Sequence, residues 1–388
     1  MKIAFANHTF ILGSGIDSLI YQLSKRLSAG NEVSIFTLCS DYTDINGVTI
    51  REKDIPFKRN RAIRQLFAPL FTGTWNQIRS ELRDYDIVIS QIYPANLLTS
   101  FPRRLKGPLS VVIEWSTPVH PFARPLEWQY VNLIKQFNGR ACRNADRVLV
   151  SSNFVKSWVK NEWGIDADKM LLDGVDFSGF DRTKAAPGNV YGRYPLLKGR
   201  PVMLYVGQVA PHKNLETLIA ALISVRRTVP DAMLLIVGSL TYPDYYNRLV
   251  KMLEQRDMED AVIFTGTVPW EALPDYYAAC DVYVTCSLWE GFLRGEAYAL
   301  AKPMIAFDVT SHADSIIPGE TGLLVKEITA EAFADAVAGL LKAKTAREKM
   351  GENGYRWARE NLDLDVIAVR LEKYLAGLLQ ERAKKNEG

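Results

Sequence analysis

Two glycine-containing loops have the residue types that bind a phosphate group. The first, Gly13-Ser14-Gly15, follows the apolar run 3–6 and precedes residues that are apolar at helical spacing. The second, Gly207 to Lys213, follows the apolar run 202–206 and precedes a similar pattern. Glycines let the backbone approach a ligand closely, and the helix that follows presents unpaired N–H groups to an anion. A plain strand-to-helix turn is the alternative, and the first loop lacks the GxGxxG spacing of dinucleotide-dependent dehydrogenases.

The segments around these loops alternate between apolar strand-like runs and amphipathic helix-like runs. This order predicts an α/β protein with two Rossmann-like domains, each a doubly wound parallel sheet covered by helices. Ligands of such sheets bind beyond the carboxyl ends of the strands. We therefore expect both loops to face a central cleft between the domains.

Composition places the boundary between these domains. Residues 186–201 are rich in glycine and proline, which is typical of a linker. We expect an N-terminal domain over 1–190 and a C-terminal domain over 191–361. The last apolar-periodic segment, about 362–388, predicts a helix that packs back on the first domain.

The overall composition is that of an ordinary soluble globular protein. The 388 residues are 48% apolar and 23% charged. The four cysteines lack CxxC spacing and the four histidines lack ligand spacing, so we expect no metal site and no other cofactor. No long apolar segment and no signal-peptide pattern are present, so we expect a cytoplasmic protein.

The net charge of +3 is unevenly distributed. Residues 1–185 have an excess of six positive charges, and the remainder has an excess of three negative charges. Because no nucleic-acid-binding motif accompanies this basic half, we expect no nucleic-acid partner. The excess suits an anionic small molecule or an anionic membrane surface.

Three stretches taken together resemble the retaining glycosyltransferases of family 4, whose fold is called GT-B. They are VGQVAPHKNLETLIAAL (206–222), SLWEGFLRGEAYALAKPMIAFD (287–308) and PGETGLLV (318–325). Segments 145–159 and 171–180 fit the same order, so the resemblance covers nearly the whole chain. It implies transfer of a hexose from a nucleotide-diphosphate sugar, of the GDP-mannose or UDP-hexose type, to a saccharide or lipid-linked acceptor.

The resemblance also implies which residues hold this donor. Lys213 would neutralise the leaving diphosphate, where charge develops. Glu290 would accept hydrogen bonds from hydroxyls of the transferred sugar, and Glu296 from the ribose. We therefore expect Lys213 and Glu290 to be the catalytic residues. The expected donor-binding residues are Gly13, Ser14, Gly15, Gly207, Gln208, Lys213, Thr267, Val268, Glu290, Gly291, Phe292, Leu293, Arg294 and Glu296.

The sequence departs from the family pattern at two places. Five residues separate Glu290 from Glu296, where the family usually has seven. Gln208 stands where the family commonly has an arginine, so one cationic partner of the diphosphate is replaced by an amide. Arg294, in the shortened loop, is a candidate to compensate.

The acceptor side is marked by polar residues after the apolar run 110–113. Glu114 ends this run, Ser116 follows, and His120 lies in a turn-rich segment. The family often has a histidine near this place. His120 has two possible roles: it lines the acceptor site, or it closes a proline turn.

A basic and apolar segment lies earlier in the same half, over residues 58–71. Its cationic residues are Lys58, Arg59, Arg61 and Arg64, and its apolar residues at helical spacing are Ile63, Leu66, Phe67, Leu70 and Phe71. Packing of the apolar face on the first sheet and docking on an anionic membrane surface are the two interpretations. The second would make the protein peripheral at the inner face of the membrane. Pro69 would break a helix here or begin one.

Two other functions compete with glycosyl transfer. A nucleotide-sugar epimerase of similar architecture would need an acid and base pair in the cleft, for which the few histidines offer little support. A non-catalytic partner with the same fold is suggested by Gln208 and the short loop, and the intact Lys213, Glu290 and Glu296 speak against it.

Overall fold

The computed structural model describes residues 1–12, 15–56, 58–59, 67, 70–91, 93–100, 105, 107–115, 125–170, 173–290 and 295–387. The chain forms two compact units. The first unit consists of residues 1–174 and 364–388, and the second consists of residues 175–363.

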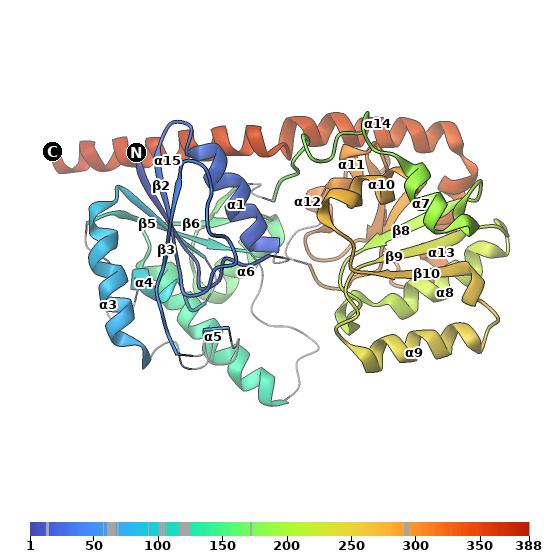
Figure 1. Ribbon diagram of the computed structural model, residues 1–388, viewed down its shortest axis with the longest axis horizontal. Coiled ribbons are helices and arrows are strands. Elements are labelled where there is room, and N and C mark those ends of the chain that lie inside the picture. The colour runs from blue at the N-terminus through green and yellow to red at the C-terminus, as the bar shows by residue number, and fades with distance from the viewer. Residues whose placement is uncertain are drawn as a thin grey trace. The chain divides into compact units, whose positions relative to one another are not determined.

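The first unit contains a seven-stranded parallel sheet of order β3-β2-β1-β4-β5-β6-β7. Its strands are β1 (Lys2–Ala6), β2 (Glu32–Thr37), β3 (Val48–Glu52), β4 (Ile87–Gln91), β5 (Leu109–Glu114), β6 (Arg147–Val150) and β7 (Asp168–Lys169). Its helices are α1 (Gly15–Leu27), α3 (Thr72–Glu81), α4 (Leu97–Ser100), α5 (Pro125–Asn144), α6 (Asn153–Trp163) and α15 (Leu364–Glu387). Figure 1 shows these elements in blue to green, with α15 in red.

Both faces of this sheet are covered. Successive side chains of a strand point to opposite faces, so alternate residues enter different cores. In β1, Ile3 and Phe5 pack in a core with α1 and α15. Ala4 and Ala6 lie in a separate core with residues of α3. The strands are accordingly apolar on both sides, as is usual in parallel sheets.

The second unit contains a six-stranded parallel sheet of order β10-β9-β8-β11-β12-β13. Its strands are β8 (Val202–Val206), β9 (Met233–Val237), β10 (Val262–Gly266), β11 (Val282–Thr285), β12 (Met304–Phe307) and β13 (Gly322–Val325). Its helices are α7 (Pro187–Arg193), α8 (Leu215–Arg226), α9 (Pro243–Glu254), α10 (Leu273–Ala278), α11 (Glu296–Ala299), α12 (His312–Ser315), α13 (Ala330–Lys342) and α14 (Lys344–Asn361). Both units therefore have the doubly wound order 3-2-1-4-5-6, and the predicted fold class is confirmed.

The segment expected to link the units belongs to the second unit instead. The division falls between Gly174 and Val175, sixteen residues before the expected boundary at 190/191. Within 186–201, the backbone N–H of Ala186 donates to Asp275 Oδ1 at 2.6 Å and the Asn189 side chain donates to its Oδ2 at 2.8 Å. Pro187 begins α7 and Pro195 begins a short 3₁₀ turn, Pro195–Leu197, so the segment is folded on the second unit rather than a free linker.

The last helix, α15, belongs to the first unit. It packs against α1, and its apolar residues join the core of the first sheet. Figure 1 shows it as the red helix labelled α15. On its polar side, Asp365 accepts a hydrogen bond from Arg26 at 2.5 Å and Glu372 accepts one from Asn31 at 2.7 Å. The unit returns at Leu364, two residues after the expected start at about 362.

A buried polar cluster joins three elements of the first unit. Glu114, the last residue of β5, is 4% exposed and accepts hydrogen bonds from the Asn138 side chain at 3.4 and 3.5 Å. Asn138, on α5, in turn accepts one from Asn96, which precedes α4, at 2.6 Å. Burial raises the pKa of the Glu114 carboxyl from 4.5 to about 8, and the Asn138 hydrogen bonds oppose this shift. Glu114 is therefore mainly neutral at pH 7.

Glycines of α14 allow it to lie close to α11, the helix that carries Glu296. A Cβ at Gly351 would overlap the carbonyl oxygen of Ala301, and one at Gly354 would overlap the Tyr298 ring. Tyr298, on α11, is fully buried and its hydroxyl donates to the carbonyl of Ser315 at 3.1 Å. The position of α11 thus depends on helix glycines more than fifty residues away in the sequence.

The same substitution at two helix glycines is expected to have opposite effects. Gly351→Ala forces α14 away from Ala301 and should lower the free energy of unfolding by about 2 kcal/mol or more. Gly339→Ala, on α13, meets no atom within 4 Å and should raise it by up to about 1 kcal/mol. Urea unfolding of both variants measures the two effects. A Gly351→Ala variant as stable as Gly339→Ala would contradict this packing.

The raised pKa of Glu114 predicts a pH-dependent stability difference between the wild type and Glu114→Gln. Between pH 5 and 8 the unfolded chain has released this proton and the folded chain retains it, so wild-type stability falls as the pH rises. Relative to Glu114→Gln, the free energy of unfolding of the wild type falls by up to about 1.4 kcal/mol per pH unit. Urea unfolding from pH 5 to 8.5 measures it, with Glu32→Gln, a carboxylate exposed on β2, as the control. Parallel profiles of the wild type and Glu114→Gln would refute the assignment.

Candidate active site

The loops that follow the strands of the second sheet lie at one edge of it, because all its strands are parallel. These loops begin after β8, β9, β10, β11 and β12. They contain the expected donor-binding residues of this unit, together with polar residues that the sequence analysis did not select.

Two glycines bring the ends of β8, β9 and β10 together. The N–H of Gly207 donates to the carbonyl of Val237 at 2.8 Å, and that of Gly238 donates to the carbonyl of Gly266 at 3.0 Å. Gly238 has φ +149°, and a Cβ there would overlap the Gly207 carbonyl. Glycine is therefore required at 238, because no side chain fits between the two loops.

Lys213 ends the loop after β8, in the short 3₁₀ turn Pro211–Lys213. The next residue, Asn214, is left-handed with φ 53°. Its side-chain amide donates to the carbonyl of Cys286, after β11, at 3.2 Å. The loop that carries Lys213 is thereby tied to the loop that carries Glu290.

The start of α8 is not capped by the local asparagine, although asparagine is a favoured N-cap residue. Asn214 occupies the N-cap position, but its side chain makes no capping hydrogen bond. The N–H of Leu215 instead donates to the hydroxyl of Tyr245, on α9, at 2.9 Å. That hydroxyl donates to Glu216 in the first turn of α8, and burial together with this carboxylate raises the pKa of Tyr245. A capping group from a distant helix has replaced the local one.

Lys213 and Glu290 form an ion pair through Lys213 Nζ and Glu290 Oε1. Their side chains are 16% and 20% exposed, so the pair is largely shielded from water. The backbone of Glu290 is also held: its N–H donates to Thr310 Oγ1 at 3.4 Å, and its carbonyl accepts from Ser311 Oγ at 3.0 Å. The structure therefore brings together the two residues expected to be catalytic, 77 positions apart in sequence.

Glu296 is the first residue of α11 and is 5% exposed. Gly295 occupies the N-cap position, so Glu296 does not cap the helix. Both Glu290 and Glu296 lie near Tyr283 of β11: burial raises the pKa of this tyrosine, and the two carboxylates raise it further, Glu290 first. The two glutamates therefore lie around the same side chain.

The other expected residues of this edge differ in their exposure. The Gln208 side-chain amide donates to Thr241 Oγ1, in the loop after β9. Thr267 is exposed and Val268 is partly buried directly after β10. An amide that bridges two loops occupies the place where the family pattern has an arginine.

The sequence analysis missed the loop after β12. Besides Thr310 and Ser311, it contains His312, which is fully buried and whose Nδ1 lies 2.8 Å from the carbonyl oxygen of Phe307. Burial lowers the pKa of His312, while that hydrogen bond and the nearby Glu290 act in the opposite sense. A polar run directly after an apolar strand was the available signal, because strand ends share an edge.

Several expected site residues lie outside the described residues. They are Gly13, Ser14, Ser116, His120, Gly291, Phe292, Leu293 and Arg294. Gly15 is described and begins α1, where a Cβ would meet no atom within 4 Å. The loop before α1 is held by Asp17, whose carboxylate accepts from the Asn7 amide at 2.5 Å and from the N–H of Ile11 at 3.0 Å.

Glu114 lies at a strand end of the first sheet, as expected for an acceptor-site residue. Its carboxyl is buried and contacts Asn138, so in this structure it joins β5 to α5. The acceptor-side expectation for Glu114, Ser116 and His120 stays a prediction.

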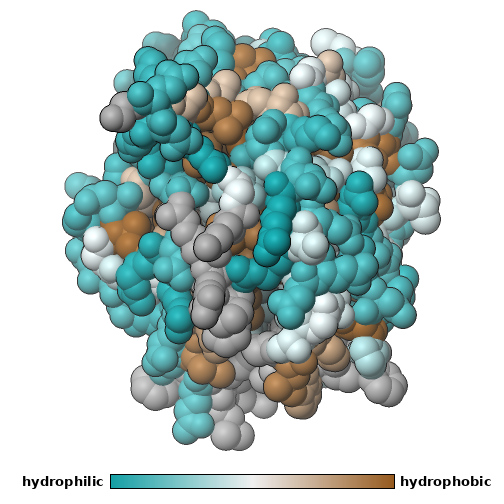
Figure 2. All heavy atoms as spheres, turned by 90° about the vertical axis from the view of Figure 1, so that its left-hand side faces the viewer, coloured by the Kyte–Doolittle hydropathy of each residue, from teal (hydrophilic) through white to brown (hydrophobic). Residues whose placement is uncertain are grey.

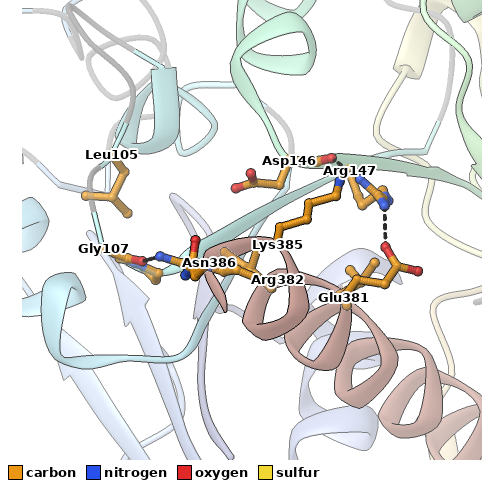
Figure 3. Close-up of a pocket in the computed structure, with 11 residues that line it drawn as sticks. Leu105, Gly107, Asp146, Arg147, Glu381, Arg382, Lys385 and Asn386 are labelled. Atoms are coloured by element: carbon orange, nitrogen blue, oxygen red, sulfur yellow. Dashed lines mark hydrogen bonds and ion pairs between the residues drawn. The ribbon is translucent and has the colours of Figure 1, made fainter. Parts of the chain in front are cut away.

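A cavity of about 560 Å³ lies at the other edge of the first sheet. It is bordered by the first residues of β5 and β6 and the last turns of α15 (Figure 3). Arg147 donates to Glu381 at 2.7 Å across it, and Arg382 donates to the carbonyl of Gly107 at 2.5 Å. These cations already have partners, and the cavity is at the amino ends of the strands, away from the loops that carry ligands in such folds.

The part of the chain that the structure describes contains no group of three His, Cys, Asp or Glu side chains arranged to hold a metal ion. Among the same residues, none of the helices combines the length and apolar character needed to cross a bilayer.

Comparison with known proteins gives relatives for most of the chain. A mannosyltransferase of Mycobacterium tuberculosis, described as a GDP-mannose-dependent alpha-(1-6)-phosphatidylinositol monomannoside mannosyltransferase, is 30% identical over 262 residues. The match spans 64% of this chain and 66% of the relative. An alpha-D-kanosaminyltransferase of Streptomyces kanamyceticus is 30% identical over 55% of each chain.

Solved structures share the fold along nearly the whole chain. A sucrose-phosphate synthase from Thermosynechococcus elongatus has a TM-score of 0.83 at 22% identity, covering 98% of this chain and 100% of the other. The Anabaena protein HepE, solved with UDP and glucose, has a TM-score of 0.77 at 16% identity, covering 97% and 99%.

Two family models match the two halves of the sequence. "Glycosyltransferase Family 4" matches residues 13–172, and "Glycosyl transferases group 1" matches residues 193–357. The two matched ranges together leave out mainly the segment around the division of the units and the last helix. With the parallel topology of both sheets, these matches show that the chain belongs to the retaining glycosyltransferases of family 4 and has the GT-B fold.

Proposed function

We propose that this glycosyltransferase moves a hexose from a nucleoside-diphosphate sugar to an acceptor hydroxyl, with Lys213 and Glu290 as its catalytic residues. The observation that carries the proposal is the Lys213–Glu290 ion pair at the carboxyl edge of the second sheet. A cation at a helix N-terminus suits a diphosphate, and a carboxylate beside it suits the hydroxyls of the attached sugar.

In the proposed reaction the bond from the anomeric carbon to the diphosphate oxygen breaks and a bond to the acceptor oxygen forms on the same face. The departing phosphate oxygen takes the acceptor's proton, so no protein nucleophile is needed. Lys213 compensates the charge that develops on the diphosphate, and the N-terminus of α8 adds its positive dipole end. Glu290 fixes the sugar through its hydroxyls. The reaction uses no metal ion.

The chemistry of the relatives supports a donor of the GDP-mannose or UDP-hexose type. The mycobacterial relative is described as GDP-mannose-dependent, and HepE was solved with UDP-glucose. Glu296, buried beside the same tyrosine as Glu290, is the proposed partner of the ribose hydroxyls. Thr267 and Val268, after the edge strand β10, are the proposed neighbours of the base.

The proposed acceptor is a saccharide or a lipid-linked saccharide that binds the first unit. The mycobacterial relative is named for a phosphatidylinositol monomannoside acceptor. A lipid-linked acceptor would bring the protein to the inner face of a membrane. Glu114, Ser116 and His120 are the residues proposed for the acceptor side.

The donor site predicts which nucleotides stabilise the folded protein. In a thermal-shift panel of UDP, GDP, ADP and their hexose derivatives, one base should raise the unfolding midpoint, because a ligand that binds the native state stabilises it. Lys213→Ala should abolish most of that shift. Lys251→Ala, an exposed lysine on α9, should leave it unchanged.

If no nucleotide shifts the wild type, the donor site is wrongly assigned, and the non-catalytic alternative is favoured. A shift that Lys213→Ala retains in full would remove Lys213 from the diphosphate site while leaving glycosyl transfer itself in place.

Membrane docking of the first unit is supported by exposed apolar side chains in its basic segment. Phe67 and Leu70 are 48% and 71% exposed, whereas Phe71 packs against the core that contains α3. Packing on the first unit therefore describes Phe71, and exposure to a membrane surface suits Phe67 and Leu70. The face of the first unit in Figure 2 is mostly hydrophilic with small separate apolar patches, so docking would rely on charge as well as on these side chains.

We expect the exposed pair to contribute to membrane binding. Phe67→Ser with Leu70→Ser should weaken co-sedimentation with phosphatidylcholine vesicles that contain phosphatidylglycerol by about tenfold, since two apolar side chains no longer enter the bilayer surface. Leu196→Ser, at a leucine of the second unit that is 47% exposed, is the control. Equal binding of both variants and the wild type would count against docking through this segment.

A further inference from the structure

We propose that the Lys213–Glu290 ion pair makes the site select the intact nucleotide sugar over the free nucleoside diphosphate, so that the product leaves while the donor is retained. This inference rests on the proposed function and specifies the selectivity of the same site. It is based on what each ligand offers to the two members of the pair.

Both charged groups are fixed before any ligand binds. Lys213 is the last residue of a 3₁₀ turn, and the side chain of its neighbour Asn214 donates to the carbonyl of Cys286. Glu290 is held through its backbone by Thr310 and Ser311. Because the loops are tied in this way, neither side chain can leave the other by a simple movement of its loop. A ligand must therefore compete with the pair that is already formed.

The environment of Glu290 makes its carboxylate depend on Lys213. Within the described part of the chain, the ion pair of Glu290 is with Lys213. His312, nearby, has a lowered pKa and is neutral at pH 7, so it supplies no positive charge. Glu296, near the same tyrosine, adds a second negative charge. A carboxylate that is mostly shielded from water and loses its cation is destabilised.

The nucleoside diphosphate and the intact nucleotide sugar differ in the partner that they offer to the Glu290 carboxylate. A nucleoside diphosphate attracts Lys213 and offers Glu290 only a phosphate of the same sign, so part of its binding energy is lost to repulsion. The intact donor also attracts Lys213, but its sugar presents hydroxyls that donate to the carboxylate. Glu290 therefore favours the donor and disfavours the product, which is the order that turnover requires.

Removal of the Glu290 charge gives a result that a purely structural ion pair would not give. A structural role predicts that Glu290→Gln weakens both ligands together, because Lys213 loses its position. The selectivity role predicts effects of opposite sign, because Lys213 becomes free for the diphosphate while the sugar loses its acceptor. The ratio of the two dissociation constants separates these cases.

The experiment is isothermal titration calorimetry of the full chain with UDP and UDP-glucose, and with GDP and GDP-mannose. For the base that binds, Glu290→Gln should tighten the diphosphate by about threefold or more, as expected from loss of a competing, partly shielded ion pair. It should weaken the nucleotide sugar, so that their ratio changes by about tenfold. Glu254→Gln, exposed at the far end of α9, should change neither constant.

Glu290→Ala removes the same charge with less bulk and should shift the diphosphate in the same direction, so it replaces Glu290→Gln if that variant does not fold. Weaker or unchanged diphosphate binding in a folded variant overturns the inference. If the wild type binds none of these ligands, the proposed function itself fails, and the two failures are thereby distinguished.

Discussion

The parallel direction of β8, β9, β10, β11 and β12 is the constraint on which the site depends. It collects at one edge five loops that are spread over about a hundred residues of sequence. Gly207 and Gly238 then allow the backbones of neighbouring loops to meet, since a Cβ at Gly238 would overlap the carbonyl of Gly207. Within this frame, single hydrogen bonds, such as that from Asn214 to the Cys286 carbonyl, are sufficient to hold charged side chains opposite each other.

Three carboxyl groups that are shielded from water, those of Glu290, Asp17 and Glu114, differ in the partners that the described residues give them. Glu290 has a cation, Lys213, which a ligand can take away. Asp17 has hydrogen-bond donors from its own loop and stays fixed. Among the described residues, Glu114 accepts from the Asn138 amide, and its raised pKa keeps it mainly neutral at pH 7. Of these three carboxyl groups, the one paired with a lysine side chain is the one that the proposed mechanism makes responsive to an anionic ligand.

The departures from the family pattern have a structural counterpart. Gln208, in place of a common arginine, bonds Thr241 and joins the loops after β8 and β9. At this position an amide that joins two loops replaces a cation, and Lys213 is the cation that the described residues place beside Glu290. The proposed influence of the ion pair on ligand choice follows from this sharing of Lys213 between Glu290 and a diphosphate.

The sequence by itself determined the strand-and-helix alternation, the two parallel sheets and the family, because hydrophobic periodicity and short loop motifs are local properties. The same motifs predicted Lys213 and Glu290 as the catalytic residues. It did not determine that these two side chains pair, that Tyr245 rather than Asn214 caps α8, or that Thr310 and Ser311 hold Glu290. It placed the division of the units at residue 190 because composition cannot tell a free linker from a segment that packs on Asp275. Each of these features is a contact between residues distant in the chain, and only the packing of the folded units decides which distant residues meet.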